Sequence, residues 1–143
     1  MKDSIPTLTA EKTIDVRFSE VDSMGIVWHG SYSLYFEDAR EAFGAKYQLE
    51  YLYMFKMGFY APLVELHFNY KKPIRYQDKI KIIITFRPTD AAKIIFDYEI
   101  FHLETNELMA TGHTVQVFLD TNYQLVWETP PFFNEWKKLN GLL

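Results

Sequence analysis

Hydrophobic and polar residues follow two different periods along this chain. Between Ala10 and Phe18, the residues Ile14, Val16 and Phe18 alternate with charged residues, a pattern that predicts a β-strand. Between Ser31 and Tyr47 the apolar residues instead recur at helical spacing, which predicts an α-helix with one apolar face. That face consists of Tyr32, Tyr35, Phe36, Ala39, Ala42 and Phe43. We expect Ser31 to cap the helix, because serine is a preferred N-cap residue.

The rest of the chain predicts mainly antiparallel strands, because the alternating pattern returns after residue 60. The predicted strands are Val64 to Tyr70, Lys79 to Arg87, Ile94 to Ile100 and Met109 to Leu119. A hairpin turn at residues 120–122 is expected to lead into a further extended segment, Gln124 to Trp127. Two short helices are also predicted, one over residues 51–57 and one from Pro130 through Leu139.

One long helix cannot cover both faces of such a sheet, although it can cover one face if the sheet curls around it. We therefore expect an α+β fold in which a curved antiparallel sheet of roughly five to six strands wraps a long central helix. The uncovered face or the sheet edge would then lie against another subunit, so we expect a homodimer or a dimer of dimers. With 143 residues the chain fits a single domain, residues 1–143, without linker or repeat.

Composition narrows the classes of function. The net charge is −4, with 15 Lys and Arg against 19 Asp and Glu, which argues against a nucleic-acid-binding face. Cysteine is absent, which excludes disulfides and thiolate chemistry and suits a reducing cytosol, so we expect a cytoplasmic protein. Residues 1–13 show no apolar segment typical of a secretory signal, and the longest aliphatic run, Ile82 to Ile84, is too short for a membrane span. The 12 Phe, 10 Tyr and 3 Trp residues fit either a bulky core or an apolar pocket or interface.

The segment from Val16 to Tyr32, just ahead of the long predicted helix, carries most of the candidate chemistry. It contains two acids, one histidine and two glycines. A helix N-terminus presents unpaired backbone N–H groups that can stabilise negative charge on a carbonyl oxygen, and a nearby carboxylate can act as nucleophile or general base. Asp22 and His29 therefore fit a hydrolytic acyl-transfer site. An equally weighted alternative is that Asp22 caps the loop and His29 is a structural histidine.

Residues 22–32 (DSMGIVWHGSY) and 35–40 (YFEDAR) resemble the signature of the 4-hydroxybenzoyl-CoA thioesterase family of hotdog-fold proteins. A looser similarity continues at residues 72–78 (KPIRYQD), which resemble the family's turn between its second and third strands. The family's fold, a long helix wrapped by an antiparallel sheet and dimerised through it, agrees with the expected architecture. Two departures, Ser31 in place of a frequent Asn and Val21 in place of Thr, leave the substrate open.

The resemblance implies an acyl-CoA thioesterase, with acyl-CoA as substrate and no cofactor or metal. The family's catalytic aspartate aligns with Asp22, which would act as nucleophile or general base, and the residue at the His29 position gives its backbone N–H to the thioester oxygen. Gly25 matches a family glycine that leaves room for the acyl group, and it completes the implied catalytic set. The implied substrate-binding residues are Ile26, Val27, Trp28, Tyr32, Glu37, Lys72 and Arg75.

Several of these residues have a competing structural interpretation. Glu37 lies on the predicted helix, where a related hotdog branch carries its carboxylate, but an ion pair around Arg40 on a solvated face is the favoured alternative. Basic residues expected near strand ends would either meet the CoA phosphates or face solvent; they are Lys71, Lys72, Arg75, Arg87 and Lys93. Large apolar residues after the long helix fit either the far end of an acyl pocket or the core; they are Phe55, Met57, Phe59 and Tyr60.

Three other functions remain open on the same fold. Acyl-carrier protein can replace CoA as the acyl carrier, which would require a basic rim for that acidic protein. A non-catalytic acyl-ligand-binding or interaction module would bind without turnover. A hydratase or dehydratase is a weaker alternative, because the usual spacing of its histidine and acid is not evident.

Overall fold

The computed structural model describes residues 5–143, and it divides them into strands and helices much as predicted. In chain order the elements are β1 (Thr9–Asp15), the 3-10 helix η1 (Phe18–Glu20), α1 (Ser31–Tyr47), α2 (Tyr51–Lys56), β2 (Leu63–Tyr70), β3 (Lys79–Arg87), β4 (Lys93–His102), β5 (Leu108–Val117) and α3 (Pro131–Leu139). Residues 1–4, the start of the segment considered for a secretory signal, lie outside the described residues. Within residues 5–143, no helix is both long and apolar enough to cross a membrane.

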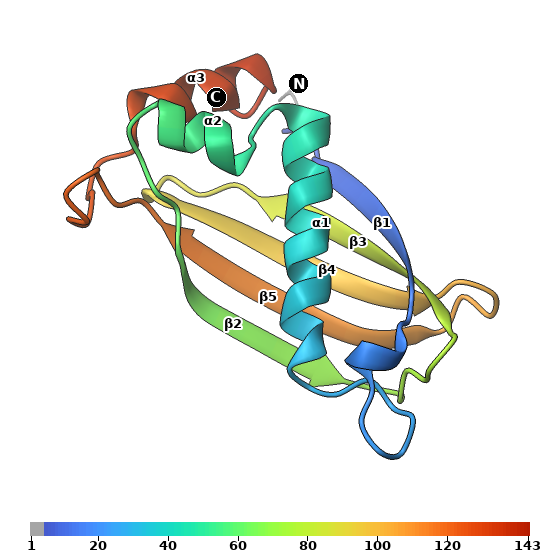
Figure 1. Ribbon diagram of the computed structural model, residues 1–143. Helices are drawn as coiled ribbons and strands as arrows, with labels where there is room; N and C mark the ends of the chain where they lie inside the picture. Colours follow the sequence, from blue (N-terminus) through green and yellow to red (C-terminus); the bar gives the residue numbers. More distant parts are fainter. Residues whose placement is uncertain (1–4) are drawn as a thin grey trace.

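The five strands form one antiparallel sheet with the order β1-β3-β4-β5-β2. The long helix α1 crosses the concave face of this curved sheet, and α2 and α3 lie together beyond one end of it (Figure 1). This arrangement confirms the predicted α+β fold, in which a long central helix is wrapped by antiparallel strands.

The first strand is shorter than predicted. It ends at Asp15 rather than Phe18, because the Val16 N–H turns to the carbonyl oxygen of Asp78 (2.9 Å) and Phe18 begins η1. Val16 is still buried, at 3% exposure, so its apolar character continues the alternating pattern although it does not belong to the strand.

The region after the last strand also differs from the prediction. β5 ends at Val117 instead of Leu119, and residues 124–127 form no strand of their own. A single bridge between Leu119 and Leu125 is all that remains of the predicted pairing. The turn at Asp120 is present, and its carboxylate accepts hydrogen bonds from the backbone N–H groups of Asn122 and Gln124.

The core lies between α1 and the concave face of the sheet. Its central side chains alternate along β3 and β4; they are Ile80, Ile82, Ile84, Phe86, Ile94, Phe96, Tyr98 and Ile100. Phe36 of α1 stacks on Tyr98 with ring centroids 4.2 Å apart, and a Cβ at Gly112 of β5 would lie 2.3 Å from the Phe36 ring. Burying one such side chain contributes about 1.5–3 kcal/mol, so packing accounts for many of the aromatic residues.

The strand β2 is a free edge of the sheet and exposes apolar side chains. Val64, Leu66 and Tyr70 are 55%, 38% and 51% exposed. An edge strand of this kind presents unpaired backbone groups together with apolar surface, which is suited to pairing with another strand. Among residues 5–143 the helices lie on one side of the sheet, and none of them covers the opposite, convex face (Figure 1).

Candidate active site

Asp22 caps a tight turn in the loop ahead of α1. Its Oδ1 accepts hydrogen bonds from the backbone N–H groups of Met24 (2.8 Å) and Ile26 (3.3 Å), and its own N–H donates to the carbonyl oxygen of Ile26 (2.8 Å). Gly25 occupies the left-handed region at φ 73°, which explains why a glycine stands there. The capping interpretation of Asp22 therefore describes its Oδ1. Its Oδ2 has no hydrogen-bond partner within residues 5–143, and the side chain is half-buried.

The loop reaches α1 with an open backbone donor. The Trp28 N–H donates to the Glu20 carbonyl oxygen (2.9 Å), whereas the His29 N–H has no acceptor among the described residues. Gly30, not Ser31, is the N-cap of α1, so that prediction was wrong. Ser31 is buried, and its hydroxyl donates to the Glu20 carbonyl oxygen (3.0 Å), which fastens the loop to the helix. The loop that carries Asp22 and His29 lies beside the N-terminal, positive end of α1 (Figure 1).

A buried carboxylate, Glu20, anchors this loop, a role that no sequence pattern indicated beyond the presence of an acid. It is 4% exposed, and its Oε1 accepts hydrogen bonds from the Arg17 N–H (2.8 Å) and the Tyr35 hydroxyl (3.0 Å). Its Oε2 accepts from Arg17 Nε (3.0 Å) and Nη2 (2.8 Å). Burial and the adjacent Glu20 carboxylate raise the pKa of Tyr35 well above its usual value, so Tyr35 remains a neutral donor.

Tyr32, the second residue of α1, packs beside the end of β2. Its ring is 3% exposed and lies 4.9 Å from the Tyr70 ring and 5.9 Å from the Phe68 ring. Burial raises the pKa of Tyr32 to about 12, so its hydroxyl is protonated at neutral pH. The helix N-terminus is thereby fixed at the Tyr70 end of the free edge strand.

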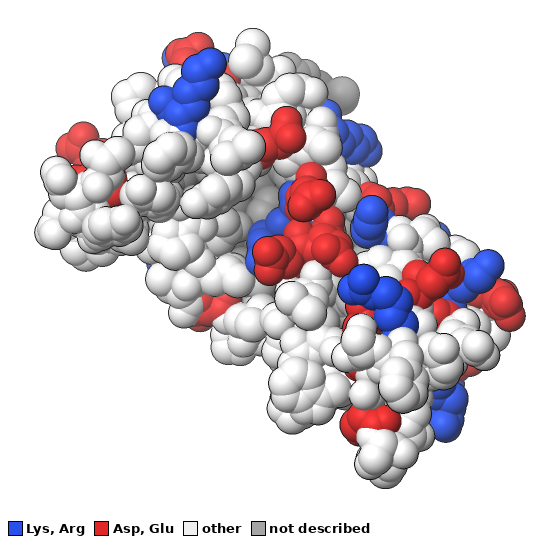
Figure 2. Space-filling view, viewed as in Figure 1, with Lys and Arg blue, Asp and Glu red and all other residues white. Residues whose placement is uncertain are grey.

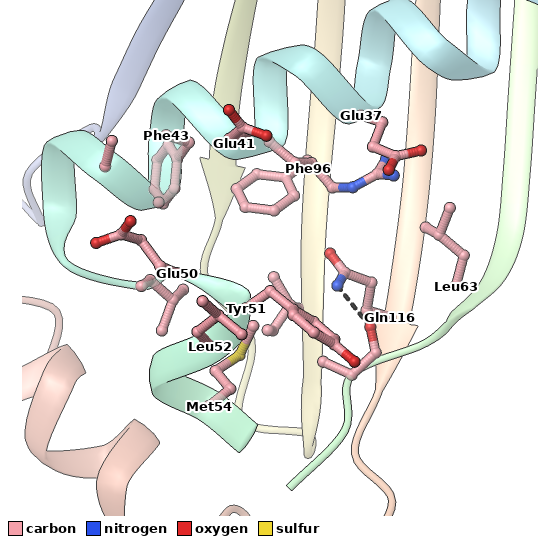
Figure 3. Close-up of a pocket in the computed structure, with 16 residues that line it drawn as sticks. Glu37, Glu41, Phe43, Glu50, Tyr51, Leu52, Met54, Leu63, Phe96 and Gln116 are labelled. Atoms are coloured by element: carbon pink, nitrogen blue, oxygen red, sulfur yellow. Dashed lines mark hydrogen bonds between the residues drawn. The ribbon is translucent and has the colours of Figure 1, made fainter. Parts of the chain in front are cut away.

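A cavity of about 670 Å³ lies farther along α1, between that helix, α2 and the concave face of β4 and β5 (Figure 3). Its apolar lining includes Phe43, Leu49, Met54, Ile94 and Phe96. Carboxylates of Glu37, Glu41 and Glu50 also line it, and acidic side chains gather beside the hollow in the space-filling view (Figure 2). Leu63, at the start of β2, forms part of the wall. The cavity combines an apolar interior with polar groups, as small-molecule sites usually do.

Two polar side chains in this cavity are held by the sheet. Arg40 Nη1 donates to the Tyr98 hydroxyl (3.1 Å), which lies 2.6 Å from the hydroxyl oxygen of Thr114. Gln116 Nε2 donates to the Ala61 carbonyl oxygen (2.7 Å). The expected ion pair around Arg40 is absent among residues 5–143, where this guanidinium bonds a neutral tyrosine instead.

The structure separates the predicted site residues into three places. One loop holds Asp22, Gly25, Ile26, Val27, Trp28 and His29, with Tyr32 in the next helical turn. Of the predicted site residues only Glu37 lines the cavity, and neither Asp22 nor His29 of the same chain does so. Lys72 and Arg75 lie in the connection from β2 to β3; Lys72 pairs with Glu107, and Arg75 is exposed.

Of the two interpretations left open for Phe55, Met57, Phe59 and Tyr60, the pocket is not supported within one chain, because none of them lines the cavity and residues 51, 52 and 54 of α2 do so instead. Phe59 packs on Phe118 and Phe132, and Phe55 packs on Tyr60. Within residues 5–143, no group of three or more His, Asp or Glu side chains is arranged to hold a metal ion.

Comparison with known proteins gives a consistent result. The family described as "Thioesterase-like superfamily" matches residues 16–137. A Bacillus subtilis protein named "Putative acyl-CoA thioesterase YneP" is 31% identical over 93 residues, which are 65% of this chain and 67% of that protein. The chloroplastic acyl-acyl carrier protein thioesterase ATL3 of Arabidopsis thaliana is 28% identical over 116 residues, 81% of this chain and 61% of that protein. The structure of a DHNA-CoA thioesterase from Staphylococcus aureus superposes with a TM-score of 0.82 at 30% identity, covering 94% of this chain and 92% of that one.

Proposed function

The chain belongs to the thioesterase-like superfamily, and from this we propose that it hydrolyses acyl-CoA thioesters to a free acid and CoA. The observation that carries the proposal is that one loop, leading directly into α1, holds both a carboxylate with an unpartnered Oδ2 (Asp22) and a backbone N–H without an acceptor among residues 5–143 (His29). A carboxylate and a backbone donor at a helix N-terminus are the two groups that acyl transfer from sulfur requires. The relatedness to an acyl-CoA thioesterase supports the choice of substrate class.

Asp22 supplies the base or the nucleophile. As a base, its Oδ2 takes a proton from water while the hydroxide attacks the thioester carbonyl carbon. The oxyanion then accepts a hydrogen bond from the His29 N–H, and collapse of the intermediate breaks the carbon–sulfur bond and releases CoA thiolate, which takes up a proton. As a nucleophile, Asp22 instead attacks the thioester carbonyl carbon and displaces CoA thiolate to form an acyl anhydride, and water then hydrolyses the anhydride to the free acid and the Asp22 carboxylate.

The site becomes complete in a homodimer paired through β2. The N-terminus of α1 lies at the Tyr70 end of β2, and the cavity lies at the Leu63 end. Antiparallel pairing of two β2 strands brings the Tyr70 end of one copy beside the Leu63 end of the other. The loop with Asp22 and His29 of one copy then lies next to the cavity of its partner.

The cavity would receive the acyl group in this arrangement. Phe43, Met54 and Phe96 provide an apolar surface for the acyl carbon atoms, and Glu37 lies on the α1 wall, where it contacts the acyl group or the attacking water. The proposal also accounts for the exposure of Leu34 and Trp28, each 52% exposed near the start of α1, because the dimer would cover them.

A substrate panel tests the activity. Purified protein is mixed with acyl-CoA thioesters of aliphatic and aromatic acids, and released thiol is followed optically. We expect steady-state turnover with at least one class and no requirement for added metal. Binding of every thioester without turnover would contradict the proposal and fit a non-catalytic module.

Acyl-carrier protein is the second candidate carrier, because a carrier-protein thioesterase is 28% identical over 81% of this chain. The same acyl group presented on CoA and on acyl-carrier protein distinguishes the two. A kcat/KM at least tenfold higher for the CoA thioester is expected, and the reverse preference would assign the carrier protein.

A further inference from the structure

An exposed aromatic pair lies beside the proposed catalytic loop. Phe18 is 76% exposed and Tyr76 is 45% exposed, and their ring centroids are 5.7 Å apart at an interplanar angle of 71°. Moving a large aromatic ring out of water lowers the free energy, so an adjacent pair on the surface is suited to a ligand that covers it. The family-wide activity does not by itself require these rings.

The pair is held rigidly against the Asp22 turn. The Tyr76 N–H donates to the Gly25 carbonyl oxygen (2.9 Å), and Arg75 forms a backbone bridge with Ile26. Two further bonds join the segment before Phe18 to the same connection, since Val16 exchanges hydrogen bonds with residues 77 and 78. Ligand contacts on these rings would therefore have a fixed position relative to Asp22.

An arginine directly precedes each of the two aromatic residues in the sequence, Arg17 before Phe18 and Arg75 before Tyr76. Arg75 is exposed, and its side chain forms no ion pair within residues 5–143. The Arg17 side chain is 71% exposed while Glu20 fixes its Nε and Nη2 atoms. Aromatic faces stack on nucleobases and guanidinium groups pair with phosphates, so this combination fits a nucleotide.

We propose that Phe18, Tyr76 and Arg75 bind the adenine nucleotide of a CoA thioester, an inference that rests on the proposed hydrolysis of such thioesters. Phe18 precedes Asp22 by four residues, so their Cα atoms are at most about 14 Å apart. The pantetheine arm of CoA joins the nucleotide to the thioester and can bridge such a separation. A carrier-protein substrate lacks the nucleotide, so this site favours CoA as the carrier.

The test compares thioesters that differ only in the nucleotide. Phe18→Ala, Tyr76→Ala and the double variant are assayed with one acyl group on CoA and on pantetheine, and free CoA binding is measured by titration calorimetry. We expect the double variant to raise KM for acyl-CoA and Kd for CoA at least about fivefold, the size of one lost stacking contact. Its kcat and its kinetics with acyl-pantetheine should not change. Trp127→Ala, which removes an 84% exposed aromatic side chain elsewhere, is the matched control and should match wild type in every measurement.

Three results would overturn the nucleotide site. The first is a double variant that binds CoA with wild-type affinity. The second is an equal rise in KM for acyl-CoA and acyl-pantetheine. The third is a change in the oligomeric state of the double variant, which would place the two rings in a subunit interface. Failure of the proposed function gives a different result. If CoA binding depends on these rings but neither thioester is hydrolysed, the nucleotide site is supported and the proposed hydrolysis is contradicted.

Discussion

In the proposed mechanism Asp22 has two separable tasks, one for each carboxylate oxygen. Oδ1 holds the turn by accepting the N–H groups of Met24 and Ile26, which needs an acceptor but no charge. Oδ2 is free for water or the thioester, and that task requires the negative charge. An asparagine at this position keeps the first task and removes the second.

Glu20 is expected to stabilise the loop on which Asp22 lies. Replacing it with glutamine keeps one acceptor oxygen but loses the charge-assisted hydrogen bonds to Arg17, so the free energy of unfolding should fall by about 1–3 kcal/mol. Urea denaturation measures the change, and kcat should fall as the loop loosens. Glu104→Gln, at an exposed turn, is the control. Wild-type stability of the Glu20 variant would contradict the anchoring role.

Sequence patterns reached some of these residues and not others. Asp22 and His29 could be found because their motif and their place before a helix are local features of the chain. Glu20 could not, because its value comes from burial against Tyr35, fifteen residues later, and an acid in an irregular segment gives no periodic signal. Residue type alone favours Ser31 as the cap, whereas its hydroxyl donates to the Glu20 carbonyl oxygen, eleven residues earlier in the chain.

At the level of elements, the proposed dimer pairs through the free edge strand β2. A charge at Leu66 would lie in the apolar surface along the paired edge, so Leu66→Arg is expected to convert the dimer to a monomer and to reduce kcat/KM at least tenfold. Light scattering after size-exclusion chromatography measures the mass. Thr13→Arg, on the opposite edge strand β1, is the control and should remain dimeric. A dimeric Leu66 variant would exclude pairing through β2.

Strands β3, β4 and β5 are joined on the convex face by Arg87, Asp97 and His113. Burial alone would raise the pKa of Asp97, but hydrogen bonds from His113 and Arg87 outweigh it and lower that pKa below its usual value. The carboxylate therefore contributes stability above about pH 4, the unfolded value, and this contribution is lost as the pH falls through the lower folded value.

The Asp97→Asn variant should therefore be less stable than wild type at neutral pH, by up to about 1 kcal/mol for such a half-exposed group. The difference should shrink as the pH falls below about 4. Urea unfolding at a series of pH values measures it, with Asp15→Asn, an exposed carboxylate, as control. A difference that is constant with pH would refute the linkage.

The long elements were predictable because their periodicity is strong. The helix over residues 31–47 and the strand over residues 79–87 have the predicted bounds. The errors fall where backbone hydrogen bonds leave the ladder, at Val16 and after Val117. The alternating side-chain pattern indicates which residues are buried. Val16 and Phe118 are buried although they lie beyond the ends of their strands, so the pattern predicts strands that are too long.

For the whole molecule, the proposed site belongs to two chains. No periodic pattern indicates this, because the cavity residues and the Asp22 loop lie apart in one chain and would meet only in the proposed dimer, through the free edge of the sheet. The expected dimer came from the need to cover a sheet, and the composite site comes from the opposite ends of β2.

Mixing two inactive variants tests the shared site. Asp22→Asn removes the base in one chain, and Ala61→Trp fills the cavity in the other. A mixed dimer has one of its two sites intact, and random pairing makes about half of the dimers mixed. Co-expression should therefore restore about a quarter of wild-type activity. Adding Leu66→Arg to both chains should abolish this recovery. Absence of recovery in dimers shown to be mixed would place each site within one chain.

The most direct test of the proposed chemistry compares two turns with the same hydrogen-bond pattern. Asp120 repeats the Asp22 geometry: its Oδ1 accepts N–H groups two and four residues later at 2.8 and 3.0 Å, and its own N–H donates to the Gln124 carbonyl oxygen at 2.9 Å. Asp22→Asn and Asp120→Asn therefore make the same local change, and both should keep the wild-type unfolding free energy within about 0.5 kcal/mol.

The measurement is kcat for acyl-CoA hydrolysis by these two variants under saturating substrate. We predict that Asp22→Asn lowers kcat at least about 100-fold and that Asp120→Asn leaves it unchanged. Turnover by the Asp22 variant within a few-fold of wild type would show that this carboxylate is only a loop cap.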